Sequence, residues 1–148
     1  MPSIDVTDSI LVRAPEAKVF ETILDYPAFE SWIPTYSCRV KSQGGKVEEQ
    51  ALVEHTIKTP FGVSRKLTRR IDRITPTRKI EESYVEGDLA GTGIWHFTPE
   101  GDGTRVSYEC QVHSTSFLMG IGLLLGGKRG HSMVYQQLLR ALRRRCEN

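Results

Sequence analysis

Two kinds of hydrophobic pattern follow one another along the chain, and their order most constrains its fold. Between residues 37 and 113, short segments of strand-forming residues are separated by turn sequences such as Gly44-Gly45, Gly87-Asp88 and Gly101-Asp102-Gly103. Short strands joined by short turns favour an antiparallel sheet, because parallel strands need long crossover connections. The predicted strands span residues 9–12, 37–42, 47–59, 63–74, 79–85, 94–98 and 106–113.

The remaining segments have a helical period. Pro15 marks the start of a helix, and apolar residues at helical spacing continue it to Leu24. A second short helical turn over residues 28–32 ends before Pro34. The predicted helix over residues 116–145 is the only element long enough to cover one face of the sheet. The order of elements therefore predicts an α+β fold.

Composition limits the class of protein. The 148 residues suit one domain, and no repeat, low-complexity tract or linker divides residues 1–148. Lys and Arg number 20 against 18 Asp and Glu, so we expect no DNA partner. The cysteines lack metal-ligand spacing, which favours free thiols and predicts neither a metal site nor a cofactor. Asp5 and Asp8 stand where a signal peptide would be basic, so we expect a cytoplasmic protein.

The segment GLLLGGKR, residues 122–129, resembles a phosphate-binding loop in sequence only. Arg129 stands where such a loop needs a Ser or Thr hydroxyl, and no parallel strand precedes the segment. We interpret it as part of the first half of the long helix, which its glycines weaken. Its apolar residues exceed what a one-sided helix needs, so they are either buried or meet a partner, a membrane surface or a ligand. The apolar run over residues 117–127 is shorter than the roughly 20 residues that span a bilayer.

Two segments carry a family resemblance. APEAKVFETILDYPAFESWIP, residues 14–34, and GDLAGTGIWHFTPEGDGTRVSYEC, residues 87–110, resemble the polyketide cyclase/dehydrase and coenzyme-Q-binding-like branch of the START-related SRPBCC superfamily. The resemblance implies a helix-grip fold. In this fold a curved antiparallel sheet of about seven strands wraps around a long C-terminal helix, two short helices follow the first strand, and an apolar cavity lies between sheet and helix. Family members bind lipids, quinones, polyketides or hormones, and they share no catalytic motif from which a catalytic residue could be assigned.

Strand alternation predicts which side chains face the interior. Trp95 and Phe97 share one face of their strand, and Tyr108 shares another with Val106 and Cys110, so the inner wall is aromatic and aliphatic. Ordinary core residues would show the same pattern. In the resembling fold the entrance would lie near Trp32, Tyr36 and the early part of the long helix. The candidate ligand-cavity residues are Trp32, Tyr36, Arg65, Arg69, Tyr84, Trp95, Phe97, Tyr108, Phe117, Met119 and Leu123.

The same alternation brings charged groups to the inner face. Arg65 and Arg69 share a face with apolar neighbours on one strand, Glu82 does so on the next, and His55 on a third. Because an unpaired buried charge is costly, these groups must pair, reach water at a cavity mouth, or contact a polar group of a ligand. We favour pairing or a position at the mouth over contact with a ligand, because one bulge would reverse the register and turn the same side chains toward water.

These features favour a protein that binds a hydrophobic small molecule, such as a lipid, quinone or polyketide-like compound, as a carrier, sensor or ligand chaperone. The alternative is an enzyme of the polyketide cyclase or dehydratase type, in which the cavity arginines or His55 would assist proton transfer. A third hypothesis is contact with a ribosome or a peripheral membrane through Arg143, Arg144 and Arg145. Those arginines also complement the helix dipole, which requires no partner.

Overall fold

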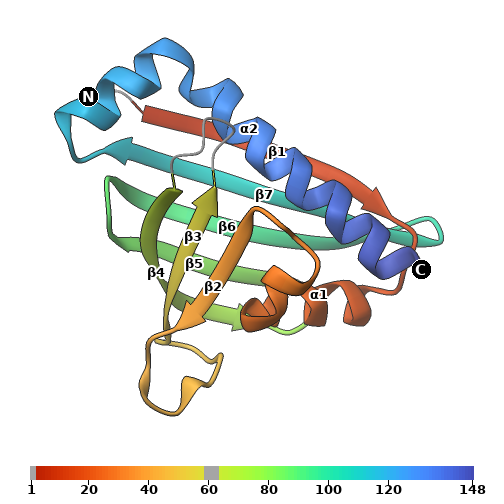
Figure 1. Cartoon of the computed structure of the whole chain (residues 1–148). Helices are drawn as coiled ribbons and strands as arrows, with labels where there is room; N and C mark the ends of the chain where they lie inside the picture. The colour runs from red at the N-terminus through yellow and green to blue at the C-terminus, as the bar shows by residue number, and fades with distance from the viewer. Residues whose placement is uncertain (1–2, 59–63) are drawn as a thin grey trace.

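The computed structural model describes residues 3–58 and 64–148, with side chains throughout except those of Gln43 and residues 117–128. The element order agrees with the order predicted from the sequence, and the main difference is that the first and sixth strands are longer (Figure 1). The elements are β1 (Ser3–Val12), α1 (Glu16–Leu24), the 3-10 helix η1 (Tyr26–Ser31), β2 (Tyr36–Val40), the 3-10 turn η2 (Gln43–Gly45), β3 (Leu52–Lys58), β4 (Ser64–Thr75), β5 (Lys79–Glu86), β6 (Leu89–Glu100), β7 (Gly103–Ser114) and α2 (Phe117–Glu147).

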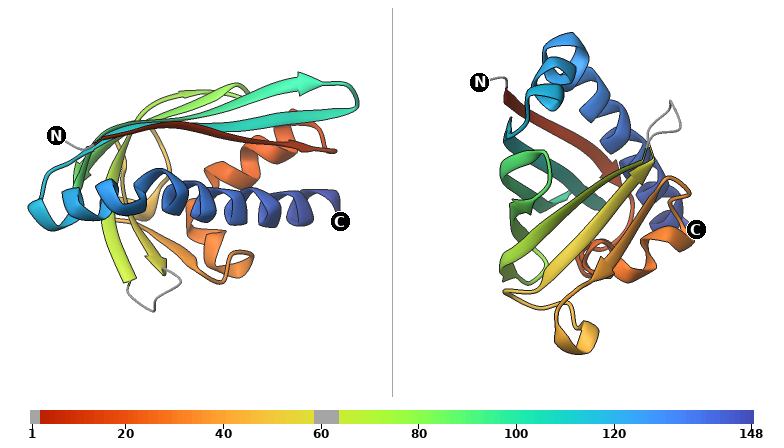
Figure 2. Two further views of the ribbon diagram at one scale, coloured as in Figure 1. Left: turned by 90° about the horizontal axis from the view of Figure 1, so that it is seen from above. Right: turned by 60° about the vertical axis from the view of Figure 1, so that its left-hand side comes forward.

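The strands form one antiparallel sheet of seven strands in the order β1-β7-β6-β5-β4-β3-β2. The sheet curves, and α1, η1 and α2 all lie on its concave side (Figure 2). Helix α2 runs along β1 and β7, while β2 to β5 curve away from it (Figures 1 and 2). This arrangement confirms the helix-grip fold expected from the family resemblance.

A bulge in β4 decides which of its side chains face inward. Between Ile71 and Arg73 the register of β4 against β5 shifts by one residue. Ile71 faces the interior before the shift, whereas Ile74 packs against the core after it. The shift therefore leaves Arg73 exposed, where its charge stays in water.

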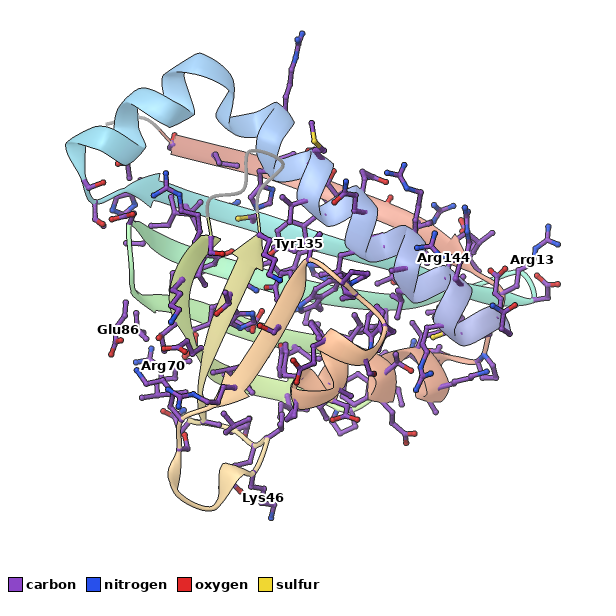
Figure 3. All side chains as sticks on the ribbon, in the orientation of Figure 1. Arg13, Lys46, Arg70, Glu86, Tyr135 and Arg144 are labelled. Atoms are coloured by element: carbon purple, nitrogen blue, oxygen red, sulfur yellow. The ribbon has the colours of Figure 1, made fainter. Side chains whose placement is uncertain are left out.

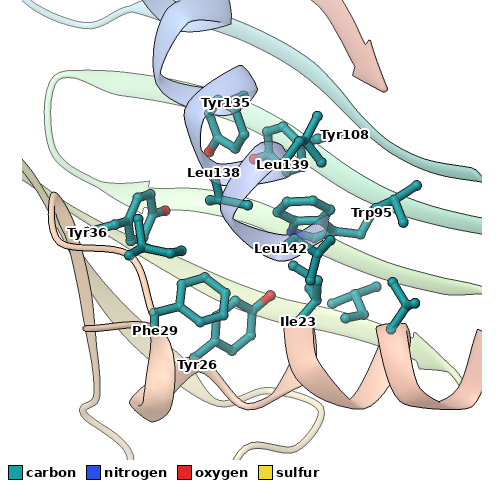
Figure 4. Close-up of a cluster of buried hydrophobic side chains, with 14 of the residues drawn as sticks. Ile23, Tyr26, Phe29, Tyr36, Trp95, Tyr108, Tyr135, Leu138, Leu139 and Leu142 are labelled. Atoms are coloured by element: carbon teal, nitrogen blue, oxygen red, sulfur yellow. The ribbon is translucent and has the colours of Figure 1, made fainter. Parts of the chain in front are cut away.

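The concave interior is packed with side chains from the sheet, from α1 and η1, and from α2. Helix α1 and η1 contribute aromatic and aliphatic residues from below the sheet, and the second half of α2 contributes one apolar face (Figure 4). Phe20 of α1 meets Phe97 of β6 edge to face, with 5.4 Å between ring centroids. The largest fully buried side chains are Trp95, Arg69, Tyr26, Tyr108, Tyr135, Phe29 and Phe97.

Gly93 makes room for one of these rings. Its partner across β7 is Cys110, but the ring of Tyr108 leans diagonally over Gly93 from the same strand. A Cβ atom at position 93 would lie 2.1 Å from the Tyr108 hydroxyl oxygen. The absence of a side chain at this position therefore lets Tyr108 reach the middle of the concave face.

We expect Gly93→Ala to destabilise the protein by about 1–3 kcal/mol, because the new methyl group would displace the buried Tyr108 ring. Urea unfolding measures the change. Gly130→Ala is the matched control, since a Cβ atom there meets nothing within 4 Å and alanine favours a helix. This control should be neutral or slightly stabilising, and equal destabilisation by both variants would contradict the packing argument.

Candidate functional site

A buried ion pair lies at the centre of the concave interior. Arg69 of β4 and Glu82 of β5 have side chains that are 2% and 0% exposed, and 3.6 Å separates the Arg69 Nη1 and Glu82 Oε1 atoms. Tyr26, at the start of η1, donates a hydrogen bond of 2.9 Å to Glu82 Oε2. Arg69 Nη2 donates to the hydroxyl of Tyr135 on α2. The pair thus joins two strands, η1 and α2 through polar contacts.

Aromatic rings surround the guanidinium of Arg69. It lies over Tyr84 at 4.6 Å from the ring centroid, and it is 5.5 Å from that of Tyr108. The rings of Tyr108 and Tyr135 stack with centroids 4.3 Å apart, and the hydroxyls of Tyr84 and Tyr108 are 2.8 Å apart. Such cation–π contacts stabilise a desolvated cation. Figure 3 shows Tyr135 between α2 and the sheet, where it completes this arrangement.

His55 occupies the side of the interior formed by β2 and β3. Its Nδ1 atom lies 2.7 Å from the Tyr36 hydroxyl and 3.3 Å from the Cys38 sulfur. Burial, together with the charge of Arg69, lowers the pKa of His55 well below its usual value, so the ring is neutral. If the Tyr36 hydroxyl donates to Nδ1, the ring proton is on Nε2. His55 therefore bonds to Tyr36 and Cys38, and Tyr26 contacts both its ring and Glu82.

Several buried polar atoms around the ion pair have no hydrogen-bond partner. Among the described residues they are Arg69 Nε and His55 Nε2, together with Glu82 Oε1 and Trp95 Nε1, which have no partner at normal hydrogen-bond distance although Trp95 acts on Glu82 as a donor. A buried polar atom that lacks a partner costs free energy of folding, commonly about 1–3 kcal/mol. Burial raises the pKa of Glu82, while Arg69 and the side chains of Tyr26 and Trp95 act in the opposite direction. The cluster thus offers hydrogen-bonding capacity that the described part of the protein does not use.

A second buried titratable pair lies one helical turn before Tyr135. The side chains of His131 on α2 and Asp8 on β1 are 9% and 7% exposed, and 3.9 Å separates His131 Nδ1 from Asp8 Oδ2. Burial and then Arg69 lower the pKa of His131 to about 4, while Asp8 opposes the shift. His131 is therefore neutral at neutral pH.

Most of the residues proposed from the sequence come together here. Tyr36, Arg69, Tyr84, Trp95 and Tyr108 are buried around the cluster. Phe97 is also buried, although it packs toward α1, and Trp32 is half-buried against Phe29.

Arg65 lies apart from the interior cluster, in an ion pair of the kind the sequence analysis favoured. Its side chain is 54% exposed and pairs with Asp88 at 3.8 Å, because it lies near the start of β4, where the sheet reaches water. Phe117, Met119 and Leu123 lie outside the residues whose side chains are described. Sequence reasoning missed Tyr135, although its helical spacing from Leu138, Leu139 and Leu142 was a usable signal. It also missed Tyr26, because the interrupted helical pattern around this residue gave no signal for its position.

Other kinds of site find no support in the described residues. Among them, no group of three or more His, Cys, Asp or Glu side chains could hold a metal ion, and Cys38, Cys110 and Cys146 are free thiols. Within the same part of the chain, no helix is long and apolar enough to cross a membrane. A hollow of about 430 Å³ lies on the outer side of the sheet, with Arg73, Lys79 and His96 in its wall, and is separate from the interior cluster.

Comparison with known proteins assigns the chain to a family. The family model described as polyketide cyclase / dehydrase and lipid transport matches residues 3–147. The chain therefore belongs to this family, which lies in the START-related SRPBCC superfamily. No curated protein matches the chain in sequence.

Solved structures show the same fold at low sequence identity. A protein from Thermus thermophilus, TTHA0849, is 20% identical with a TM-score of 0.81, and the match covers 97% of both chains. The Zhui aromatase/cyclase from Streptomyces sp. R1128 is 15% identical with a TM-score of 0.81, over 98% of this chain and 94% of that one. A START superfamily protein from Mycobacterium smegmatis is 17% identical with a TM-score of 0.74, over 97% of both chains. These likenesses support the fold and do not identify a substrate.

Removal of one partner of the buried ion pair should be strongly destabilising. We expect Arg69→Met to lower the free energy of unfolding by about 3–5 kcal/mol, because Glu82 would remain buried without its cation. The double variant Arg69→Met/Glu82→Leu should recover much of this loss. Urea unfolding of Arg65→Met, which removes the exposed pair with Asp88, provides the control and should show a loss of about 1 kcal/mol or less. Equal losses in the two single variants would contradict the central role of the buried pair.

The buried histidines should make the protein less stable in acid. When a histidine is neutral in the folded protein and gains a proton on unfolding, the folded state loses stability as the pH falls below the unfolded pKa of 6.5. For His131 this loss continues until the pH reaches the folded pKa of about 4. The loss attributable to His131 should reach about 3 kcal/mol over this range. Urea unfolding at several pH values measures it. The difference in unfolding free energy between wild type and His131→Phe isolates this residue from Glu82, whose raised pKa acts in the opposite direction. Parallel profiles of unfolding free energy against pH for the two proteins would refute the assignment to His131.

Proposed function

We propose that the protein binds a hydrophobic small molecule carrying a polar oxygen in the concave interior, as a carrier, sensor or ligand chaperone. The observation that carries this proposal is the buried Arg69–Glu82 pair, in which Arg69 Nε lacks a hydrogen-bond partner among the described residues. A ligand oxygen would satisfy the Arg69 Nε–H group. Apolar walls with a few convergent polar groups are typical of small-molecule sites.

A purely structural role explains the ion pair less well. Well-packed apolar side chains in place of a buried ion pair are often neutral or stabilising, so the pair is a poor means of gaining stability. Buried titratable groups with shifted pKa values are also more frequent at functional sites than elsewhere. The retention of Arg69 and Glu82 within an aromatic interior therefore supports recognition of a ligand.

The end of the interior near the start of α2 is the favoured place for the apolar part of the ligand. Val6, Ile57 and Leu89 pack against the core but are only partly buried, unlike Trp95 and Tyr108 deeper in the sheet. Leu89 pairs with Ser114, three residues before α2 begins. Apolar side chains that are partly exposed around a concave face offer surface that a hydrophobic ligand would cover.

The relatives support the class of ligand in general terms. The matching family is described by polyketide cyclase/dehydrase activity and lipid transport, and one structural neighbour is an aromatase/cyclase. Lipids, quinones and polyketide-like compounds all combine an apolar body with polar oxygens. The enzyme alternative, a cyclase or dehydratase, would use the same cluster, with Arg69 and neighbouring tyrosines stabilising charge on a substrate oxygen.

Native mass spectrometry of protein purified from its own cells, with organic extraction of the bound compounds, tests this proposal. We expect a stoichiometric lipid, quinone or polyketide-like molecule. Arg69→Lys, which loses the Nε–H group but keeps the charge, should retain less of it than wild type, whereas Arg65→Lys should retain it fully. An empty protein that also fails to bind a panel of hydrophobic compounds would refute the proposal.

The exposed face of α2 favours a second candidate function, contact with a ribosome or an anionic membrane. Five arginines are exposed along the helix from residue 129 onward, and none of them forms an ion pair within the described part of the chain. A cluster of unpaired cations attracts phosphate-rich surfaces. We define these residues as the arginine stripe: Arg129, Arg140, Arg143, Arg144 and Arg145.

Co-sedimentation with ribosomes and with anionic vesicles tests the arginine stripe. We expect binding at low salt that falls steeply as the salt concentration rises, because counterion screening weakens contacts between exposed charges. Replacement of Arg140, Arg143 and Arg144 by Gln should abolish it. The absence of co-sedimentation at low salt would exclude this second function.

A further inference from the structure

The His131 imidazole is the most unusual polar group outside the Arg69–Glu82 cluster. Its side chain is 9% exposed, yet neither ring nitrogen has a hydrogen-bond partner among the residues whose side chains are described. Buried polar atoms nearly always have partners, so an imidazole with two unpaired nitrogens requires an explanation. The ring lies one helical turn before Tyr135, on the side of the packed interior that is nearest to the first half of α2.

Packing fixes the orientation of this imidazole. It stacks on Tyr135 with centroids 4.6 Å apart and 23° between the ring planes, and Tyr108 lies further along the same stack at 6.4 Å. Stacking on the Tyr135 ring restricts the plane of the imidazole, and with it the directions in which the edge that carries both nitrogens can point. His131 is thus oriented by stacking, with no hydrogen bond from its ring to any described side chain.

Asp8 decides which nitrogen carries the proton. Its carboxylate accepts hydrogen bonds of 3.3 Å from Ser132 Oγ and 3.3 Å from Gln136 Nε2, so α2 itself holds it in place. Its Oδ2 atom is 3.9 Å from His131 Nδ1, which is too long for a hydrogen bond but close enough to favour a proton on that nitrogen. His131 Nε2 is then a buried lone pair that accepts hydrogen bonds.

We propose that His131 Nε2 accepts a hydrogen bond from an alcohol or phenol group of the bound molecule, so that the Asp8–His131 pair selects hydroxylated ligands. This inference rests on the proposed ligand-binding function and narrows its ligand class. Arg69 Nε offers a donor and His131 Nε2 an acceptor, and Tyr135 contacts both residues, since its hydroxyl accepts from Arg69 and its ring stacks on His131. Asp8 is a positioning residue, because it acts through His131.

A pair of probes tests the proposal, one with a phenol hydroxyl and the other with a methyl group in place of the hydroxyl hydrogen. We would measure the affinities of 1-naphthol and 1-methoxynaphthalene by fluorescence titration or calorimetry. Wild type should bind 1-naphthol about tenfold more tightly, the difference expected for one buried hydrogen bond. His131→Phe keeps a flat ring in the stack but removes the acceptor, so it should bind both probes equally. Its affinity for the methyl ether should match that of wild type.

Two further variants keep the test independent of a folding defect. Asp8→Asn removes the charge that favours the proton on Nδ1, so it should reduce the preference for 1-naphthol while the affinity for the ether stays unchanged. His113→Phe replaces an exposed histidine and should alter neither affinity. Retained affinity for the ether also shows that each variant is folded.

The outcomes separate this proposal from the function on which it rests. A preference for 1-naphthol that persists in His131→Phe would overturn the role of His131, and so would equal binding of both probes by wild type. In either case the ligand-binding function would stand. Failure of wild type to bind either probe would count against both proposals.

Discussion

The Arg69–Glu82 ion pair is the interaction on which the organisation of the interior depends. A charge pair that is excluded from water needs hydrogen-bond partners on every side, because the interior stabilises isolated charges poorly. Tyrosines from η1 and α2 bond directly to the pair, and those of β5 and β7 surround the guanidinium. The sheet and α2 are therefore joined by a polar network as well as by apolar packing.

This network explains features that apolar packing alone would not require. Gly93 has no side chain where Tyr108 crosses it, which lets the Tyr108 ring stack on Tyr135 beside Arg69. Burial keeps the tyrosine hydroxyls and His55 neutral, so the ion pair holds the formal charges of the cluster. Within the described residues the network also leaves the Arg69 Nε donor and the His55 Nε2 atom without a hydrogen-bond partner. A protein interior with this composition is suited to recognition of a polar group on an apolar molecule.

Much of this arrangement was predictable from the sequence, and the remainder depends on long-range geometry. Alternation along single strands correctly placed Trp95, Tyr108 and Arg69 on the inner face, because the period of a strand is a local property. The pairing of Arg69 with Glu82 depends on a register set partly by bulges in β4, which a sequence does not reveal. Arg65 follows the same alternation, but its side chain is exposed because it lies near the end of a strand. The Asp8–His131 pair joins residues 123 positions apart, so no local pattern in the sequence indicates it.

A high-resolution crystal structure of the protein as isolated from its own cells would test the central claim most directly. The account predicts electron density for a bound molecule in the concave interior, with an oxygen within hydrogen-bonding distance of Arg69 Nε. Arg69 and Glu82 would remain paired beside it. A closed interior without a bound molecule, in which protein groups alone satisfy Arg69 Nε and Glu82 Oε1, would contradict the claim that this cluster exists to recognise a ligand.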